Sequence, residues 1–256
     1  MIKIYGKKPY KVAVIHGGLA KLGILSLVAQ ELAKVIGVIE PIQTKCTVKE
    51  LISELHEQIL SIGKVPISLI GHSWGAWLTI LYATEYPEVV EQIILVGCSP
   101  LKSNYVAEIL ERRVERFSEQ EQMKLNALLA SLEDPQNNKK DIALTKLKKL
   151  VEKSDNYEID IDIDLENNFP SNERMYAKIW GEVSEIRNNG DLIEKLNKIQ
   201  CPVVVIHGEN DTHPIEGVVE PLSQYNISFE KYVLPKCGHS PFNEVHAKEL
   251  FYMILK

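Results

Sequence analysis

A serine flanked by two glycines lies between a short apolar run and a helical pattern. The segment reads Gly71-His72-Ser73-Trp74-Gly75 and fits the pattern G-x-S-x-G. In such a tight turn, side chains at positions 71 and 75 would collide with neighbouring backbone, and the serine hydroxyl is lifted clear of the sheet. That hydroxyl faces a helix N-terminus, where partial positive charge favours a developing anion. The pattern predicts that Ser73 is a nucleophile, and the alternative is a turn in which Ser73 only caps the helix.

A serine hydroxyl is a weak nucleophile unless a base takes its proton, so a histidine must lie nearby in space. Of the seven histidines, His239 lies in the loop that follows the last predicted strand, free to reach over the edge of a sheet. We predict that His239 is the base. Five others are expected to have structural or surface positions: His16 and His207 at strand ends, His56 and His246 on helices, and His72 pointing away across the turn.

The base needs a carboxylate that orients it, from another loop at the same edge of the sheet. Residues 207–214 follow a predicted strand and contain both Glu209 and Asp211. Asp211 is the better candidate and Glu209 is its rival, whereas residues 97–101 contain no acidic side chain. The order serine, aspartate, histidine along the chain is the order expected when this triad is carried by a parallel sheet.

The hydrophobic pattern predicts the fold that must position these residues. Short apolar runs alternate with amphipathic helical stretches, first over residues 1–100 and again after residue 190. The expected strands are 12–15, 38–39, 65–70, 90–96, 201–206 and 229–234, and the expected helices are 24–35 (closed by Gly37), 48–62, 74–86 and 246–255. This alternation predicts an α/β fold with a mostly parallel sheet flanked by helices.

Residues 101–190 interrupt the alternation with helical stretches and almost no strand signal. Ser118 and Glu121 form a capping-box pattern, and apolar residues recur at helical spacing from Val106 to Phe117. The apolar face of this helix must be buried against another part of the protein, and the opening of the active site above Ser73 is the nearest candidate. We therefore predict a core of residues 1–100 and 191–256, and a helical cap insertion of residues 101–190 that sets substrate choice.

Four motifs in this order resemble those of the α/β-hydrolase fold serine hydrolases, in particular the compact, cap-bearing esterases and the proline iminopeptidase branch. They are the nucleophile turn at 71–75, the oxyanion loop His16-Gly17-Gly18-Leu19, the acid loop at 207–214 and the histidine loop Gly238-His239. The resemblance implies that the backbone N–H groups of Gly18 and Trp74 form the oxyanion hole, and Leu19 could take the place of Gly18. The sheet of that family usually has eight strands. Only Ile2–Tyr5 could form an extra strand before residue 12 of this chain, so we expect the first hairpin to be absent or shortened.

The leading interpretation is a serine hydrolase that cleaves a small-molecule acyl bond, with a carboxylic ester as the expected substrate. Ser73 would attack the carbonyl, His239 would take and return the proton, and Asp211 would hold the imidazole tautomer. A second interpretation is amide cleavage of the proline iminopeptidase type, which needs cap carboxylates at the pocket, for which Glu173, Glu182 and Glu185 are available. A third is a ligand-binding receptor on the same fold.

Composition narrows the class of protein. The chain has 256 residues, of which 45% are hydrophobic, and its net charge of −6 offers no basic surface for nucleic acid or anionic lipid. Its four cysteines are scattered, which argues against a structural zinc site and a disulfide framework. No apolar run approaches the ~20 residues that span a bilayer, and we do not expect the first residues to act as a secretory signal. We expect a cytoplasmic enzyme without metal or cofactor, and its oligomeric state stays open.

Three other features are expected to be structural. The acidic run 160–164 begins like a calcium-binding loop, but Leu165 stands where glycine is needed and Ser171 where glutamate is needed. That run is expected to be an extended surface segment. Trp77, one helical turn after the serine, is expected in the core, and Cys98 is expected to act as a small buried hydrophobe.

Overall fold

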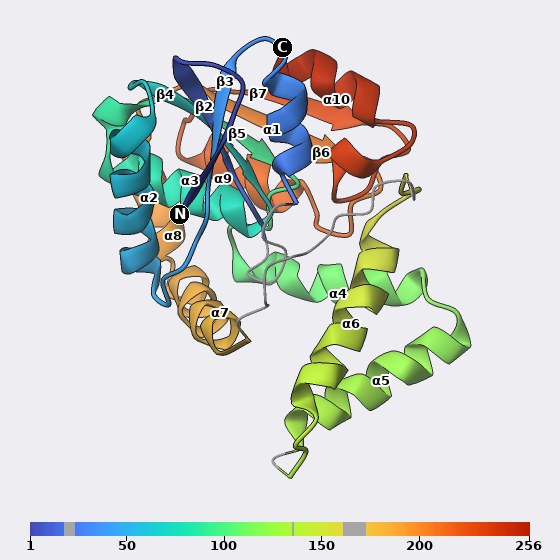
Figure 1. The fold of residues 1–256 in the computed structure, drawn as a ribbon. Helices are drawn as coiled ribbons and strands as arrows, with labels where there is room; N and C mark the ends of the chain where they lie inside the picture. Colours follow the sequence, from blue (N-terminus) through green and yellow to red (C-terminus); the bar gives the residue numbers. More distant parts are fainter. Residues whose placement is uncertain (18–23, 135, 161–172) are drawn as a thin grey trace.

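The computed structural model describes residues 1–17, 24–134, 136–160 and 173–256, and Figure 1 shows how its elements are arranged. Within these residues, seven strands form one sheet in the order β1-β3-β2-β4-β5-β6-β7. The strands are β1 (Ile2–Tyr5), β2 (Tyr10–Ile15), β3 (Gly37–Pro41), β4 (Ile67–His72), β5 (Val90–Val96), β6 (Val203–Gly208) and β7 (Phe229–Leu234). Only β1 is antiparallel to its neighbour. The predicted mostly parallel sheet is confirmed, with Ile2–Tyr5 as its edge strand.

Helices cover both faces of the sheet and divide the apolar side chains into two clusters. One cluster includes Val28 of α1 (Ser26–Leu32) and Phe251 of α10 (Lys248–Leu255). The other collects the buried faces of α2 (Val48–Ile62), α3 (Trp74–Glu85) and α9 (Glu216–Gln224). Short helices complete the connections: α8 (Asp191–Glu194), η1 (Pro87–Val89), η2 (Ser103–Tyr105), η3 (Lys195–Lys198) and η4 (Pro241–Asn243). The result is three layers with the sheet in the middle (Figure 1).

The predicted elements are confirmed most closely where a local signal marks their ends. Helix α2 begins after Thr47, whose side chain accepts a hydrogen bond from the Glu50 amide, and it ends before Gly63. Strand β4 begins later than predicted because Pro66 has no amide hydrogen for the ladder. The prediction that Gly37 closes a helix is wrong, since α1 ends at Leu32 and Gly37 opens β3. Helix α9 was not predicted, and Pro221 inside it weakens the helical pattern.

Between β5 and β6 the chain forms helices α4 (Val106–Glu115), α5 (Glu119–Glu133), α6 (Lys140–Asp155) and α7 (Glu173–Asn188). Helix α5 begins with the predicted capping box of Ser118 and Glu121. Helices α5 and α6 pack on each other around a small cluster that includes Phe117 and Leu150, and they extend away from the sheet in Figure 1. Helix α7 instead joins the main core through Ile179.

Two sequence expectations fall on residues outside the described part of the chain. They concern Gly18 and Leu19 of the oxyanion loop, and the acidic segment beyond residue 160. Among the helices that the structure describes, none combines the length and the apolar character needed to cross a membrane.

Candidate active site

Ser73 occupies the turn between β4 and α3 in a backbone conformation with φ of 55°. Non-glycine residues rarely adopt such positive φ values, and those that do cluster at functional sites. A Cβ atom at Gly71 would lie 2.4 Å from the carbonyl oxygen of Gly75, and one at Gly75 would lie 2.1 Å from that of Ile15. The collisions predicted from the sequence therefore exist, and they explain why both flanking positions are glycine.

The Ser73 hydroxyl does not cap helix α3. Its side chain makes no capping hydrogen bond, and its Oγ lies 3.0 Å from Nε2 of His239. The alternative of a merely capping serine is therefore wrong.

His239 connects this hydroxyl to a buried carboxylate. Its Nδ1 lies 2.9 Å from Oδ2 of Asp211, which is 1% exposed. An ionised carboxylate can only accept hydrogen bonds, so Nδ1 is the donor and Nε2 is left to accept from the Ser73 hydroxyl. The rival carboxylate, Glu209, is exposed at the surface. The structure thus brings Ser73, His239 and Asp211 into one continuous chain of hydrogen bonds.

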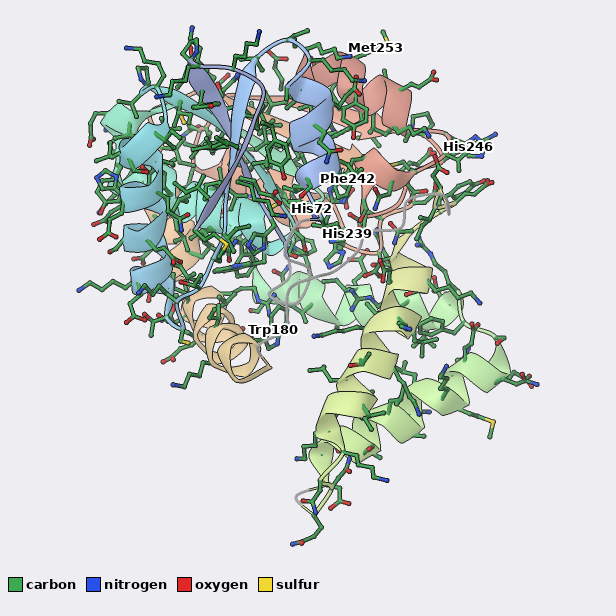
Figure 2. All side chains as sticks on the ribbon, viewed as in Figure 1. His72, Trp180, His239, Phe242, His246 and Met253 are labelled. Carbon is green, nitrogen blue, oxygen red and sulfur yellow. The ribbon has the colours of Figure 1, made fainter. Side chains whose placement is uncertain are left out.

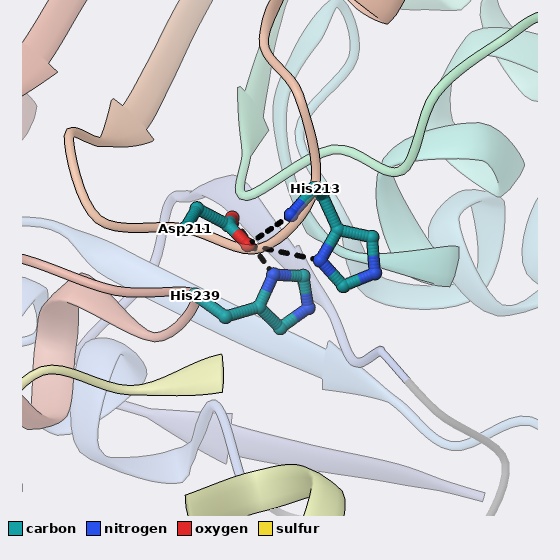
Figure 3. A group of neighbouring side chains, drawn as sticks. All are labelled: Asp211, His213 and His239. Carbon is teal, nitrogen blue, oxygen red and sulfur yellow. Dashed lines mark hydrogen bonds and ion pairs between the residues drawn. The ribbon is translucent and has the colours of Figure 1, made fainter. Parts of the chain in front are cut away.

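A further histidine shares this carboxylate (Figure 3). The Nδ1 atom of His213 lies 2.9 Å from Oδ1 of Asp211, and the His213 amide donates to the same oxygen at 2.9 Å. His207 approaches from another side, with Nε2 3.4 Å from Oδ2. Although burial opposes ionisation, the three imidazoles hold the pKa of Asp211 well below its usual range. Sequence reasoning missed His213, and its position two residues after Asp211 in the acid loop is the signal that could have found it.

The pKa of His239 reflects two opposing effects. Burial alone would lower this pKa, but the charge and hydrogen bond of Asp211, with further attraction from Asp155, outweigh it. The pKa of His239 is therefore raised above its ordinary value. Burial lowers the pKa of the neighbouring His213, and repulsion from His239 adds to this effect. The site thus favours a proton on His239 rather than on His213.

Asp155, at the end of α6, connects helix α4 to the acid loop (207–214) and the histidine loop (238–239). Its carboxylate accepts two hydrogen bonds of 2.7 Å from Arg113 of α4 and one of 2.6 Å from the hydroxyl of Thr212. Its backbone carbonyl accepts from the His239 amide at 2.7 Å. Burial opposes ionisation of Asp155, yet the Arg113 guanidinium keeps its pKa below the usual value. No spacing in the sequence indicated this contact, because the four residues come from distant segments.

A cavity of about 410 Å³ opens beside Ser73 and His239. Most of its wall is apolar and comes from α3 and from helices α4, α6 and α7: Trp74, Trp77, Val106, Ile109, Leu110, Leu144, Leu147, Val151, Ile179, Trp180 and Val183. Its charged lining residues are Arg113, Lys148, Asp155 and Arg187. In Figure 2, the labelled Trp180 and His239 mark the α7 helix and the histidine loop. Such a cavity suits the hydrocarbon part of a small substrate.

The other predicted residues have the following positions. His72 contacts the histidine loop, since its Nε2 donates to the His239 carbonyl at 2.9 Å. His16 is fully buried, and burial lowers its pKa to about 4. Trp77 is buried, as predicted, and donates to the Ser99 carbonyl; its ring also lines the cavity. Cys98 is buried, which raises the pKa of its thiol.

The remaining predicted residues concern the oxyanion hole and the amide-cleaving alternative. Trp74 is the first residue of α3, and a helix leaves the first amides without an intrahelical partner. The carboxylate of Glu182 accepts from the Val48 amide at the start of α2, and Glu185 is exposed. Neither lines the cavity. The side chain of Glu173 lies outside the described residues.

Asp211, His213 and His239 also have the atom types of a metal site, with one ligand atom from each lying within 4.8 Å of the others. Both Nδ1 atoms already face the carboxylate at hydrogen-bond distance. A metal ion bound there would therefore replace two protons and break the connection from Asp211 to Ser73.

Comparison with known proteins identifies the family. The Alpha/beta hydrolase family matches residues 45–251. A pimeloyl-[acyl-carrier protein] methyl ester esterase from Nitrosomonas europaea is 23% identical over 186 residues, which are 68% of this chain and 65% of that protein. The chain thus spans slightly less than two thirds of the length of that relative.

Solved structures show the same fold. VinJ superposes with a TM-score of 0.69 at 16% identity, covering 99% of this chain and 92% of that one. Proline iminopeptidase from Mycobacterium smegmatis superposes with a TM-score of 0.68 at 16% identity and the same coverage of both chains. Together with the sheet order and the family match, these similarities show that the chain belongs to the alpha/beta hydrolase family.

Proposed function

We propose that this chain is a serine hydrolase that cleaves a carboxylic ester of a small molecule through a covalent acyl-enzyme. The observation that carries the proposal is the chain of hydrogen bonds from Asp211 through His239 to Ser73, at the wall of an apolar cavity. Membership of a hydrolase family supports it, and the esterase from Nitrosomonas europaea supports an ester as the substrate.

In the first half-reaction, Ser73 Oγ attacks the substrate carbonyl while Nε2 of His239 takes the hydroxyl proton. The oxyanion that forms lies near the start of α3, where the Trp74 amide would donate to it, together with the predicted Gly18 amide. His239 then returns the proton to the departing alkoxide, which leaves as an alcohol. Asp211 stabilises the imidazolium between these two steps.

In the second half-reaction, a water molecule attacks the acyl-enzyme and His239 takes one of its protons. The carboxylic acid leaves, and the proton returns to Ser73 Oγ. These two half-reactions need no metal or cofactor. The cytoplasmic location of the protein stays a prediction.

We further propose that residues 101–190 act as a cap on the core of residues 1–100 and 191–256. Helices α4, α6 and α7 provide much of the apolar cavity wall, which supports a role in substrate choice. The same segment also contributes Arg113 and Asp155, which hold the acid and histidine loops. Loss of cap residues should therefore affect the alignment of the catalytic groups as well as the fit of the substrate.

The test combines a fluorophosphonate probe with p-nitrophenyl esters of increasing acyl length. The probe should label the protein once, at Ser73, and Ser73→Ala should abolish both labelling and turnover. Ser99→Ala is the matched control, because Ser99 also lines the cavity but its hydroxyl has no histidine partner among the described residues. Undiminished labelling of Ser73→Ala would overturn the assignment.

The same assays separate the alternatives. Labelling of Ser73 without turnover of any ester would favour a ligand-binding receptor. Faster cleavage of prolyl p-nitroanilide than of any ester would favour a peptidase of the proline iminopeptidase type.

A further inference from the structure

A positively charged side chain of α7 lines the same cavity as Ser73. Arg187 has its guanidinium carbon 5.5 Å from the centre of the Trp77 ring. Its Nε atom is buried and has no hydrogen-bond partner within the described residues. These residues also provide Arg187 with no ion pair.

Two carboxylates, one in the cavity wall and one on the same helix as Arg187, are already engaged by other groups. Asp155 is the only acidic residue among the described lining residues, and Arg113 and Thr212 hold it. Glu182, on the same helix as Arg187, is bound to the amide of Val48. Burial of a guanidinium donor without a partner costs free energy, so a group that enters the cavity with an acceptor oxygen would be bound there.

The ring of Trp77 holds the guanidinium in a way that suits a carboxylate. A cation over an aromatic face is attracted to the ring, and the N–H groups at the edge of the guanidinium stay available. A carboxylate matches that edge with two parallel hydrogen bonds. We propose that Arg187 binds an anionic group, a carboxylate, carried by the substrate, so that the preferred substrates are esters with a second, ionised end. This inference rests on the proposed function of Ser73.

The separation of Arg187 from Ser73 would set the preferred length of such a substrate. Trp77 follows Ser73 by four residues, so the two lie about one helical turn, ~5.4 Å, apart along α3. The guanidinium carbon of Arg187 lies 5.5 Å from the centre of the Trp77 ring. Half-esters of adipate, pimelate and suberate therefore sample a range of separations between the ester carbonyl and the carboxylate.

The kinetic test compares mono-p-nitrophenyl esters of these three diacids with the same esters in which the distal carboxylate is an amide. The wild-type protein should favour the charged ester by about 10-fold or more in kcat/KM, as expected for hydrogen bonds between ionised groups. Arg187→Gln should remove this preference, and Arg187→Lys should keep part of it. Lys178→Gln should keep the preference, because Lys178 is an exposed cation on the same helix that does not line the cavity.

A second pair of substrates tests the position of the anion. Acetate esters of 4-hydroxybenzoate and of its amide carry the charge, or its neutral equivalent, in the leaving group. A preference that depends on Arg187 in either pair supports the inference and tells which end of the substrate the arginine binds. No preference in either pair, or a preference that survives in Arg187→Gln, would overturn it.

Binding measurements separate this inference from the proposed function. In Ser73→Ala, monoethyl adipate should raise the melting temperature more than its amide analogue, and Arg187→Gln should remove the difference. That result would support the anion site even if Ser73 proves not to be a nucleophile. Labelling of Ser73 without any effect of charge would support the hydrolase and reject the anion site. If Arg187→Gln does not fold, Arg187→Lys and the charge preference of the wild type decide the question.

Discussion

The imidazole of His213 stacks on that of His239, with ring centroids 4.2 Å apart and planes inclined by 24°. Each ring faces a different oxygen of Asp211 at 2.9 Å, so one carboxylate aligns two histidines (Figure 3). Because only His239 reaches Ser73, His213 acts through Asp211 and through the stack. It is a positioning residue for the proposed reaction.

His213→Phe should lower kcat by about 10-fold with little change in KM. The change keeps an aromatic ring against His239 but removes one hydrogen bond to the charged Asp211, and such bonds contribute about 1.5–3 kcal/mol. Stopped assays with p-nitrophenyl butyrate would measure both constants. His213→Asn, whose amide can still donate to Asp211, should retain more kcat than His213→Phe; the reverse order would show that packing, and not the hydrogen bond, matters.

Asp211→Asn should reduce kcat by roughly 10³–10⁴-fold, because the amide favours the wrong imidazole tautomer and cannot stabilise the imidazolium. Glu209→Gln is the matched control from the same loop, and it should have a small effect since Glu209 is exposed. Steady-state kinetics of the two purified variants show whether Asp211 or Glu209 orients His239. A larger loss in Glu209→Gln would move the orienting role to that residue.

The activity should fall at acidic pH with a midpoint above 6.5, the ordinary pKa of histidine. His239 must be neutral to act as a base, and its raised pKa keeps it protonated to a higher pH, so the acid limb of kcat/KM shifts upward. Asp155→Asn should move this midpoint to lower pH, because the Asp155 charge contributes to the raised pKa.

The control for this shift is His246→Gln, which changes an exposed histidine that is paired with Glu158. Its pH profile should match that of the wild type. An unchanged midpoint in Asp155→Asn would show that Asp155 holds the loops without tuning the base.

Val106→Trp and Val151→Trp should shorten the preferred acyl chain. Both valines line the cavity from the helical segment, so a larger side chain reduces its volume of about 410 Å³. A p-nitrophenyl ester series would show the shift in kcat/KM, with fluorophosphonate labelling of Ser73 preserved. Leu129→Trp on α5, away from the cavity lining, is the control. Folded variants that keep the parental profile would argue against a cap.

Gly75→Ala should destabilise the protein by about 3 kcal/mol, since the new methyl group meets the Ile15 carbonyl and the packing around it is tight. Gly181→Ala in α7 should instead stabilise it by about 0.5–1 kcal/mol, because nothing lies within 4 Å and alanine favours a helix. Urea unfolding curves of the two variants measure the difference. Equal stability of Gly75→Ala and the wild type would contradict the close contact.

Sequence alone determined the parts of this protein that depend on local chain geometry. The turn around Ser73 could be predicted because only glycine fits at positions 71 and 75. The bounds of α2 could be predicted because Thr47 and Gly63 mark its ends. Asp211 and His239 could be paired with Ser73 because the carboxyl ends of parallel strands meet at one edge of a sheet.

Other contacts between side chains from separate segments could not be predicted and became known from the folded chain. Arg113, Asp155 and Thr212 come from two helices and a loop, and no periodicity relates their positions. The same holds for Arg187 over Trp77. Such contacts depend on how the helices pack against the sheet. Side-chain hydrogen bonds and ring contacts form between groups that are neighbours in space, and the positions of these groups along the chain have no regular spacing.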